Sequence, residues 1–88
     1  MIKIKEGFIL REVADTYAVV AVGKASMNFK GMITLNETGA FLWKYLALGI
    51  TKEDLLTKLL DEYEVSKEDA IKHIDLFINK LKESDILE

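Results

Sequence analysis

The pattern of apolar residues changes abruptly at Asn36, and this change limits the folds that the chain can adopt. Before Asn36, three runs are rich in β-branched and aromatic residues, as strands are: 8–13, 17–22 and 31–35. After it, apolar residues recur at intervals of three and four, as in amphipathic helices. This order predicts an α+β domain, with a three-stranded antiparallel sheet followed by three helices.

The first two strand-like runs are expected to form a hairpin. Only the short break at Ala14–Thr16 separates them, and Asp15 suits a turn, although glycine would suit it better. Residues 23–30 are expected to form a loop. The third strand is then predicted at Gly31–Leu35.

The third run contains neither a charged residue nor a proline. Natural edge strands are usually protected against unwanted pairing by charge, proline or a bulge. Gly31–Leu35 is therefore either a central strand or an edge left open for pairing with another chain. The residues alone are compatible with both arrangements.

Both faces of the predicted sheet are partly apolar. In the second strand, Val19 and Val20 point to opposite faces, and in the third strand Met32 points away from Ile33. An antiparallel sheet with one face in water should alternate more cleanly. Something other than the chain's own core is expected to cover part of this sheet, and two copies of the chain could pair through it as a homodimer.

Each predicted helix begins at a residue that caps helices well: Asn36, Thr51 and Ser66. The first helix is expected to run to Leu48, with Gly49 ending it. Only about two residues separate the second and third helices, so these two form a helix-turn-helix. The whole order predicts a winged helix-turn-helix.

The third helix has the clearest apolar face. Its members, spaced to fall on one arc, are Ala70, Ile71, Ile74, Phe77, Ile78 and Leu81. Leu76 lies on the opposite face among charged and polar residues. It is either one of the isolated exposed leucines that proteins normally carry or part of a contact surface. Phe41 and Trp43, in the first helix, are expected to lie in the core.

Composition limits the classes of function that remain. The 88 residues predict one domain, 1–88, and the absence of cysteine removes disulfides and thiolate metal sites. No apolar run approaches the roughly 20 residues that a membrane span needs, and the N-terminus has no apolar stretch typical of a secretory signal. We therefore expect a cytoplasmic protein without a membrane partner.

Charge argues against a nucleic-acid partner. Residues 36–88 hold seven cations and twelve acids. The third helix, which would read DNA in a winged helix, carries four of each. Phosphate neutralisation drives nucleic-acid affinity, so this helix is poorly equipped for it. A winged-helix DNA-binding protein remains an alternative hypothesis.

No arrangement of residues predicts catalysis or a cofactor. The single histidine, His73, has one carboxylate in reach on its own helix, Asp69, which is too few ligands for a metal site. The serines have no histidine base nearby in sequence, and the glycines are isolated rather than gathered in a phosphate-binding loop. We expect no enzyme activity, no metal and no cofactor.

Three segments together resemble a known family. "GMITLNETGAFLW" is preceded by the pair "FILREV" and "VVAVG" and followed by "EYEVSKEDAIKHIDLFINKLKESDIL". In order and spacing, from about Phe8 to Leu87, they resemble the PqqD-like family, small peptide chaperones also called RiPP recognition elements. One departure is Ser84–Asp85, where many relatives place a glycine that ends the last helix.

The resemblance implies a fold and a function. The implied fold is a winged helix-turn-helix of three strands and three helices. The implied function is an adaptor that binds the leader segment of a ribosomally made precursor peptide. It would present that leader to a modifying enzyme, such as a radical SAM enzyme, a cyclase or a leader peptidase. The leader would add as a strand to the third strand and lie against the third helix, which favours an open edge at Gly31–Leu35.

Candidate peptide-binding residues follow from that arrangement. From the third strand and the residue before it they are Lys30, Gly31, Met32, Ile33 and Thr34. From the third helix they are Lys72, His73, Leu76 and Lys80. Whichever of Met32 and Ile33 faces away from the core would touch the peptide, and the sequence does not say which border of the helix faces it. The other alternative is a protein–protein interaction module whose partner is not a precursor peptide.

Overall fold

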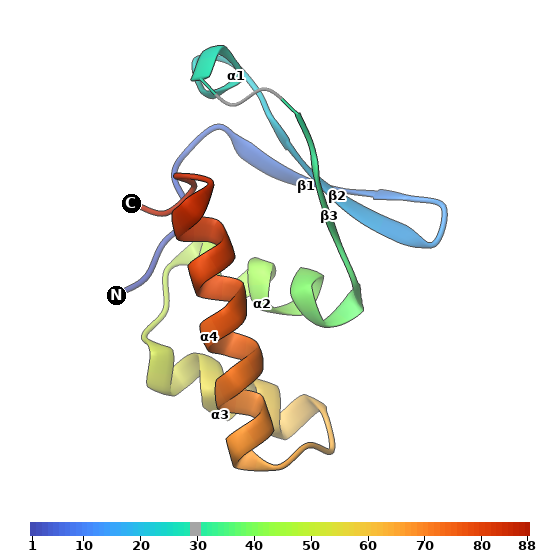
Figure 1. Cartoon of the computed structure of the whole chain (residues 1–88), viewed down its shortest axis with the longest axis vertical. Coiled ribbons are helices and arrows are strands. Elements are labelled where there is room, and N and C mark those ends of the chain that lie inside the picture. Colours follow the sequence, from blue (N-terminus) through green and yellow to red (C-terminus); the bar gives the residue numbers. More distant parts are fainter. Residues whose placement is uncertain (29–30) are drawn as a thin grey trace.

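A computed structural model describes residues 1–28 and 31–88 of the chain. A sheet lies at one end of the molecule, three long helices lie on one side of it, and the two termini emerge close together (Figure 1). Helix α2 (Glu37–Leu48) contacts both the sheet and helix α3 (Lys52–Glu62), whereas helix α4 (Lys67–Glu83) packs mainly on α3.

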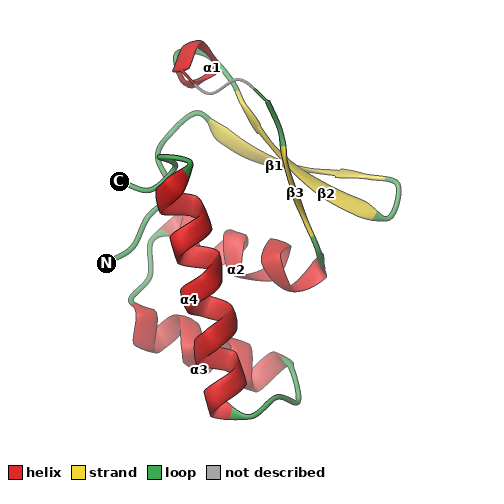
Figure 2. Cartoon of the chain, viewed as in Figure 1, coloured by secondary structure: helices red, strands yellow, loops and turns green. Residues whose placement is uncertain are grey.

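The sheet has three antiparallel strands in the order β1-β2-β3, as Figure 2 shows in yellow. They are β1 (Phe8–Val13), β2 (Thr16–Ala21) and β3 (Ile33–Leu35). The predicted hairpin is confirmed, and a two-residue turn joins its strands, with Ala14 at a φ of 57°. In the described part of the chain β3 pairs only with β2, so of the two arrangements left open by the sequence the structure has the edge strand.

Two boundaries in this region differ from the prediction. The expected loop at 23–30 contains a one-turn helix, α1 (Ala25–Asn28). Two hydrogen bonds of the i→i+3 type form its start, from Ser26 N–H to Gly23 O and from Met27 N–H to Lys24 O. A single turn leaves no apolar periodicity that a sequence pattern could show. The third strand is shorter than predicted, since it begins at Ile33 instead of Gly31, and Gly31 itself has a φ of 130°, outside extended geometry.

The predicted helix starts are confirmed by their hydrogen bonds. The Asn36 side chain accepts from the N–H of Gly39 at 2.8 Å, and Thr51 and Ser66 accept equivalent bonds at the starts of α3 and α4. Gly49 ends α2 with a φ of 91° and donates its N–H to carbonyls of the last turn. The helix-turn-helix of α3 and α4 is tied further by an ion pair between Lys52 and Asp75.

Helix α4 ends without a glycine. Asp85 takes the left-handed conformation, with a φ of 57°, and donates its N–H to Lys82 O, while Ile86 N–H reaches Leu81 O, both at 3.0 Å. This pair of bonds is a Schellman motif, which normally favours glycine at the left-handed position. Lys5 pairs with the Asp85 carboxylate at 2.9 Å, so the strained residue is held by the N-terminal segment.

The last residues of the chain return to the N-terminal segment. Leu87 pairs with Ile4, and Lys5 N–H donates to Ile86 O at 2.8 Å. Ile86 is fully buried and Ile4 nearly so. The N-terminal segment therefore closes the side of the core that the sheet leaves open.

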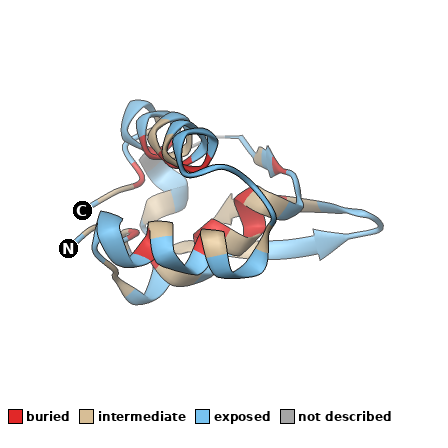
Figure 3. Ribbon diagram, turned by 90° about the horizontal axis from the view of Figure 1, so that it is seen from below, coloured by how far each residue is buried: buried red, intermediate tan, exposed pale blue. Residues whose placement is uncertain are grey.

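The core lies between the sheet and the helices, and Figure 3 shows the buried stretches of the ribbon in red. Trp43 is buried, as predicted, and the predicted apolar face of the last helix is buried at Ala70, Ile74, Ile78 and Leu81. The other core members are Ile4, Val19, Leu35, Leu42, Leu46, Leu55, Leu59 and Ile86. The outer part of the β1–β2 hairpin extends beyond this core and is exposed.

No helix of the described residues has the length and apolar character needed to cross a membrane. Within the same described ranges, no three histidine or acidic side chains are grouped closely enough to hold a metal ion.

Candidate functional site

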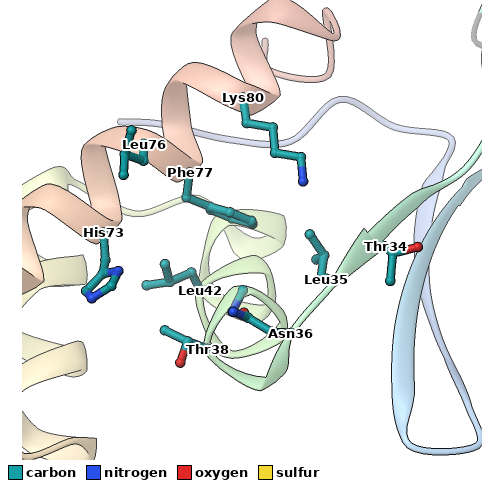
Figure 4. Close-up of a pocket in the computed structure, with 10 residues that line it drawn as sticks. Thr34, Leu35, Asn36, Thr38, Leu42, His73, Leu76, Phe77 and Lys80 are labelled. Carbon is teal, nitrogen blue, oxygen red and sulfur yellow. The ribbon is translucent and has the colours of Figure 1, made fainter.

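A groove of about 280 Å³ runs between the open edge of β3 and helix α4. The start of α2 forms its base, and Figure 4 shows the side chains around it. The residues that line it are Thr34, Leu35, Asn36, Thr38, Gly39, Leu42, His73, Leu76, Phe77 and Lys80. Residues of β3, α2 and α4 thus meet at one surface.

The groove depends on the abrupt passage from β3 into α2. Leu35 ends the strand, Asn36 caps the helix, and Gly39 lies in the first turn against Phe77 of α4. A Cβ on Gly39 would lie 3.3 Å from the Leu35 Cβ, closer than ordinary van der Waals contact, and 3.4 Å from the Phe77 ring, at the lower limit of such contact. Glycine therefore lets the strand end, the helix start and the Phe77 ring approach one another, and this gives the "LNETG" stretch a structural reason.

The hydrogen bonds of the hairpin fix which backbone groups face the open edge. The N–H of Val22 donates to Gly7 O at 2.7 Å, so these two residues form a hydrogen-bonded pair at the end of the ladder. In an antiparallel ladder, bonded and non-bonded pairs alternate. Ala18, four residues before Val22, therefore directs its N–H and C=O toward β1. Val19, three residues before Val22, directs these groups toward β3.

The same alternation places the backbone of Thr34 at the free edge. Val19 lies opposite Ile33, and because its backbone groups face β3, these two residues bond to each other. Ala18 lies opposite Thr34, but its backbone groups face β1. The N–H and C=O of Thr34 are therefore directed away from β2, toward the groove side of the edge. They are the donor and acceptor that an added strand would use.

The groove has an apolar base and a polar, cationic upper end. Leu35 and Leu42 are buried at its base, and the half-buried Phe77 ring extends toward Leu35 (Figure 4). Leu76 is 70% exposed on the α4 wall, next to the half-buried Phe77, so the two side chains offer apolar surface to a ligand in the groove. Lys80 reaches from α4 toward the strand, and within the described ranges no carboxylate lines the groove.

The tyrosines with shifted pKa values line a separate hollow on the other side of α2. The negative charge of Glu12 is the main cause that raises the pKa of Tyr17, with smaller effects of burial and of Glu37. Burial is the main cause that raises the pKa of Tyr63, with Glu37 and Glu62 adding to it. Neither ring belongs to the groove.

The structure brings together some of the predicted site residues and separates others. Thr34, His73, Leu76 and Lys80 line the groove, whereas Lys72 does not. The border of the last helix that faces the groove is thus the one that holds His73 and Lys80. Lys30 lies outside the described residues.

The remaining described strand candidates do not line the groove. Ile33 is half-buried and packs against the core. Met32 is 63% exposed and falls on the opposite face by the strand alternation, while Gly31 is exposed. Of the pair Met32 and Ile33, Met32 is the one that faces away from the core.

Sequence reasoning missed the base of the groove. Leu35, Leu42 and Phe77 read as core residues, and Asn36 reads as a helix cap, because each also has that structural role. Among the apolar residues of the groove, Leu76 was the one whose position in the sequence pattern indicated a contact surface. Its neighbour Phe77 shares both roles, since it packs against the core and also borders the groove.

The chain is similar to a known family and to two solved structures. The sequence model described as Coenzyme PQQ synthesis protein D (PqqD) matches residues 23–87. The structure "TbiB1 in Complex with the TbiA(beta) Leader Peptide" is 19% identical, with a TM-score of 0.77 over 98% of this chain and 94% of that one. "Lasso peptide synthetase B1 complexed with the leader peptide" is 21% identical, with a TM-score of 0.76 over 99% and 96%. These likenesses show a shared fold, and no curated protein matches the chain in sequence.

Proposed function

The chain belongs to the PqqD family, and we propose that it is an adaptor that binds the leader segment of a ribosomally made precursor peptide. The leader would add as a fourth strand to β3 and pack its side chains into the groove against α4. In both similar structures the protein is in complex with a leader peptide, which supports this proposal.

One observation carries the proposal most directly: the outward backbone of Thr34 lies beside an exposed apolar wall. Strand addition needs unpaired N–H and C=O groups for affinity and side-chain pockets for selectivity. The open edge of β3 supplies the first, and the groove with Leu76 and Phe77 supplies the second. A monomer that left this edge and this wall uncovered would risk non-specific association.

The proposed role is to bind, not to catalyse. The groove side chains include an imidazole and an ammonium, but no serine or carboxylate lies among those that line it in the described ranges. A bound leader would therefore be passed unchanged to a separate modifying enzyme, such as a radical SAM enzyme, a cyclase or a leader peptidase. We place this encounter in the cytoplasm, where ribosomes release the precursor.

The outer face of the sheet is available for a further contact when the groove is occupied. Ile9, Val13 and Met32 are exposed there, on the side opposite the core. The modifying enzyme is the occupant that we propose for this face. A second copy of the chain is the alternative, and analytical ultracentrifugation distinguishes the two, because a homodimer would be present without the enzyme.

The proposal is tested by titrating the protein into a fluorescently labelled leader of a short precursor peptide whose gene lies beside a modifying-enzyme gene in the same genome. We expect saturable one-to-one binding, measured by anisotropy, and no binding of the core segment of the same precursor. Equal affinity for leader and core, or no binding of the leader, would overturn the proposed function.

A further inference from the structure

The groove wall on α4 presents an apolar patch and then a cation, one helical turn apart. Leu76 and Phe77 form the patch, and Lys80 follows. In the described ranges no acidic side chain lies within ion-pair distance of Lys80, because the ion pairs found there join Lys5 to Asp85 and Lys52 to Asp75. The ammonium is thus available to a ligand in the groove.

The spacing of these side chains matches the spacing of an extended peptide. Four residues of a helix rise about 6 Å, so Leu76 and Lys80 lie about that far apart along the α4 axis. In a strand, side chains on one face repeat every second residue, about 6.7 Å apart. An added strand can therefore place one side chain against the apolar patch and another, two positions away, against Lys80.

The register of strand addition decides which peptide residues face this wall. A residue that pairs with Thr34 shares the face of the Thr34 side chain, which points away from Leu35 and Phe77 in Figure 4. The residues on either side of it lie opposite Leu35 and Ile33 and point to the groove face. Two groove-facing residues thus flank one residue that pairs with the open edge.

The direction of the added strand sets the order of the two groove-facing residues. Strand β3 runs toward α2, whereas α4 runs the other way, so the last turns of α4 lie toward the start of β3 (Figure 1). Figure 4 likewise shows Lys80 on the side of Thr34, and His73 nearer Thr38. A peptide antiparallel to β3 would pass the apolar patch first and Lys80 second, and antiparallel pairing is slightly more stable than parallel pairing.

We propose that the leader recognised here carries a large apolar residue followed two positions later by Asp or Glu, a motif Φ-x-(Asp/Glu). The apolar residue lies against Leu76 and Phe77, the middle residue pairs with Thr34, and the carboxylate meets Lys80. This inference rests on the proposed function and deepens it, because it names the chemistry and the order of the recognised segment. Parallel addition would require the reversed motif, (Asp/Glu)-x-Φ.

A selection from a library of random twelve-residue peptides displayed on phage tests the motif without knowledge of the natural leader. On the unmodified protein we expect enrichment of Φ-x-(Asp/Glu). On Lys80→Glu the enriched motif should become Φ-x-(Lys/Arg), since the charge requirement is reversed. Lys72→Glu makes the same charge change on α4 outside the groove and should leave the motif unchanged.

Synthetic peptides that carry the enriched motif give the magnitude. Replacing the acid by Gln should weaken binding about 1.5- to 5-fold, the range expected for an exposed ion pair. The same replacement should have no effect on binding to Lys80→Gln, and the difference should shrink as salt is added.

The outcomes separate this inference from the proposed function. Enriched peptides that lose binding with Thr34→Pro but show no acid, or show it before the apolar residue, would overturn the motif and leave strand addition intact. Enriched peptides that bind Thr34→Pro as tightly as the unmodified protein, or a selection that enriches no peptide, would overturn both.

Discussion

Proline substitution at two adjacent positions of β3 should separate leader binding from folding. Thr34 directs its N–H to the open edge, so proline there removes a donor that the free protein does not use in its sheet. Ile33 lies opposite Val19 and directs its N–H inward to β2, so proline there breaks the β2–β3 ladder. The two substitutions have the same chemistry and differ only in the direction of the lost donor.

The magnitudes follow from the hydrogen bonds involved. In Thr34→Pro, one lost bond to the leader costs about 1 kcal/mol, or about fivefold in affinity. The proline ring also occupies the place where the carbonyl of the leader must lie, so we expect at least a tenfold loss in total. The unfolding free energy of this variant should stay within about 0.5 kcal/mol of the parent, as for other surface changes.

Ile33→Pro should instead lose both stability and binding. The broken ladder bond and the carbonyl left without a partner together cost about 2–3 kcal/mol. For a domain of this size that lowers Tm by roughly 8–20 °C. Thr34→Val is the matched control for the exposed position, because it keeps the backbone N–H and should bind like the parent.

Leader affinity is measured by isothermal titration calorimetry and stability by thermal unfolding for each variant. Strand addition at β3 would be refuted if Thr34→Pro and Ile33→Pro both remained folded and bound the leader with the affinity of the parent. A loss of binding in Thr34→Val equal to that in Thr34→Pro would show that the side chain, not the backbone, carries the contact.

Three further predictions concern the wall, the hairpin and the chemistry. Leu76→Asp should weaken leader binding by about tenfold or more, since it places a charge where the leader covers an apolar side chain, whereas Lys72→Glu should bind like the parent. If calorimetry shows that Lys72→Glu loses affinity and Leu76→Asp does not, the leader binds at the other border of α4. Ala14→Gly should raise the unfolding free energy by about 0.5–1 kcal/mol, because a left-handed φ strains alanine and not glycine, and a fall in the midpoint of urea unfolding would contradict this. Precursor incubated with the protein alone should keep its mass in mass spectrometry, and a reproducible covalent change would refute a purely binding role.

The helix boundaries could be read from the sequence because each is set by a local interaction. Asn36, Thr51 and Ser66 each accept a bond from an N–H three residues later, and such caps are visible as residue types at fixed offsets. The hairpin was predictable for the same reason, since a short polar break between two β-branched runs leaves few alternatives.

The features that the sequence did not predict depend on contacts between distant segments or on unusual backbone angles. The residues alone left the position of β3 open, because no local pattern encodes which strand pairs with β2, and only the family resemblance favoured the edge position that the structure has. The end of α4 uses Asp85 in a conformation that glycine would favour, and the Lys5 side chain that pairs with it is far away in the chain.

The groove was only half predictable, because its residues serve two purposes. Leu76 and Lys80 could be identified as exposed positions on the last helix, but which border faced β3 required the packing of α4 on the rest of the molecule. Leu35, Leu42 and Phe77 match the core pattern and are in fact core residues that reach the surface at the groove.

Amide hydrogen exchange at Thr34, with and without saturating leader, tests the central claim most directly. In the free protein the Thr34 N–H faces the open edge and should exchange rapidly, whereas the N–H of Ile33 bonds to β2 and should already be protected. With the leader bound, the Thr34 amide should become at least as protected as that of Ile33. If the Thr34 amide exchanges equally fast in the free protein and in the saturated complex, the leader does not pair with this edge.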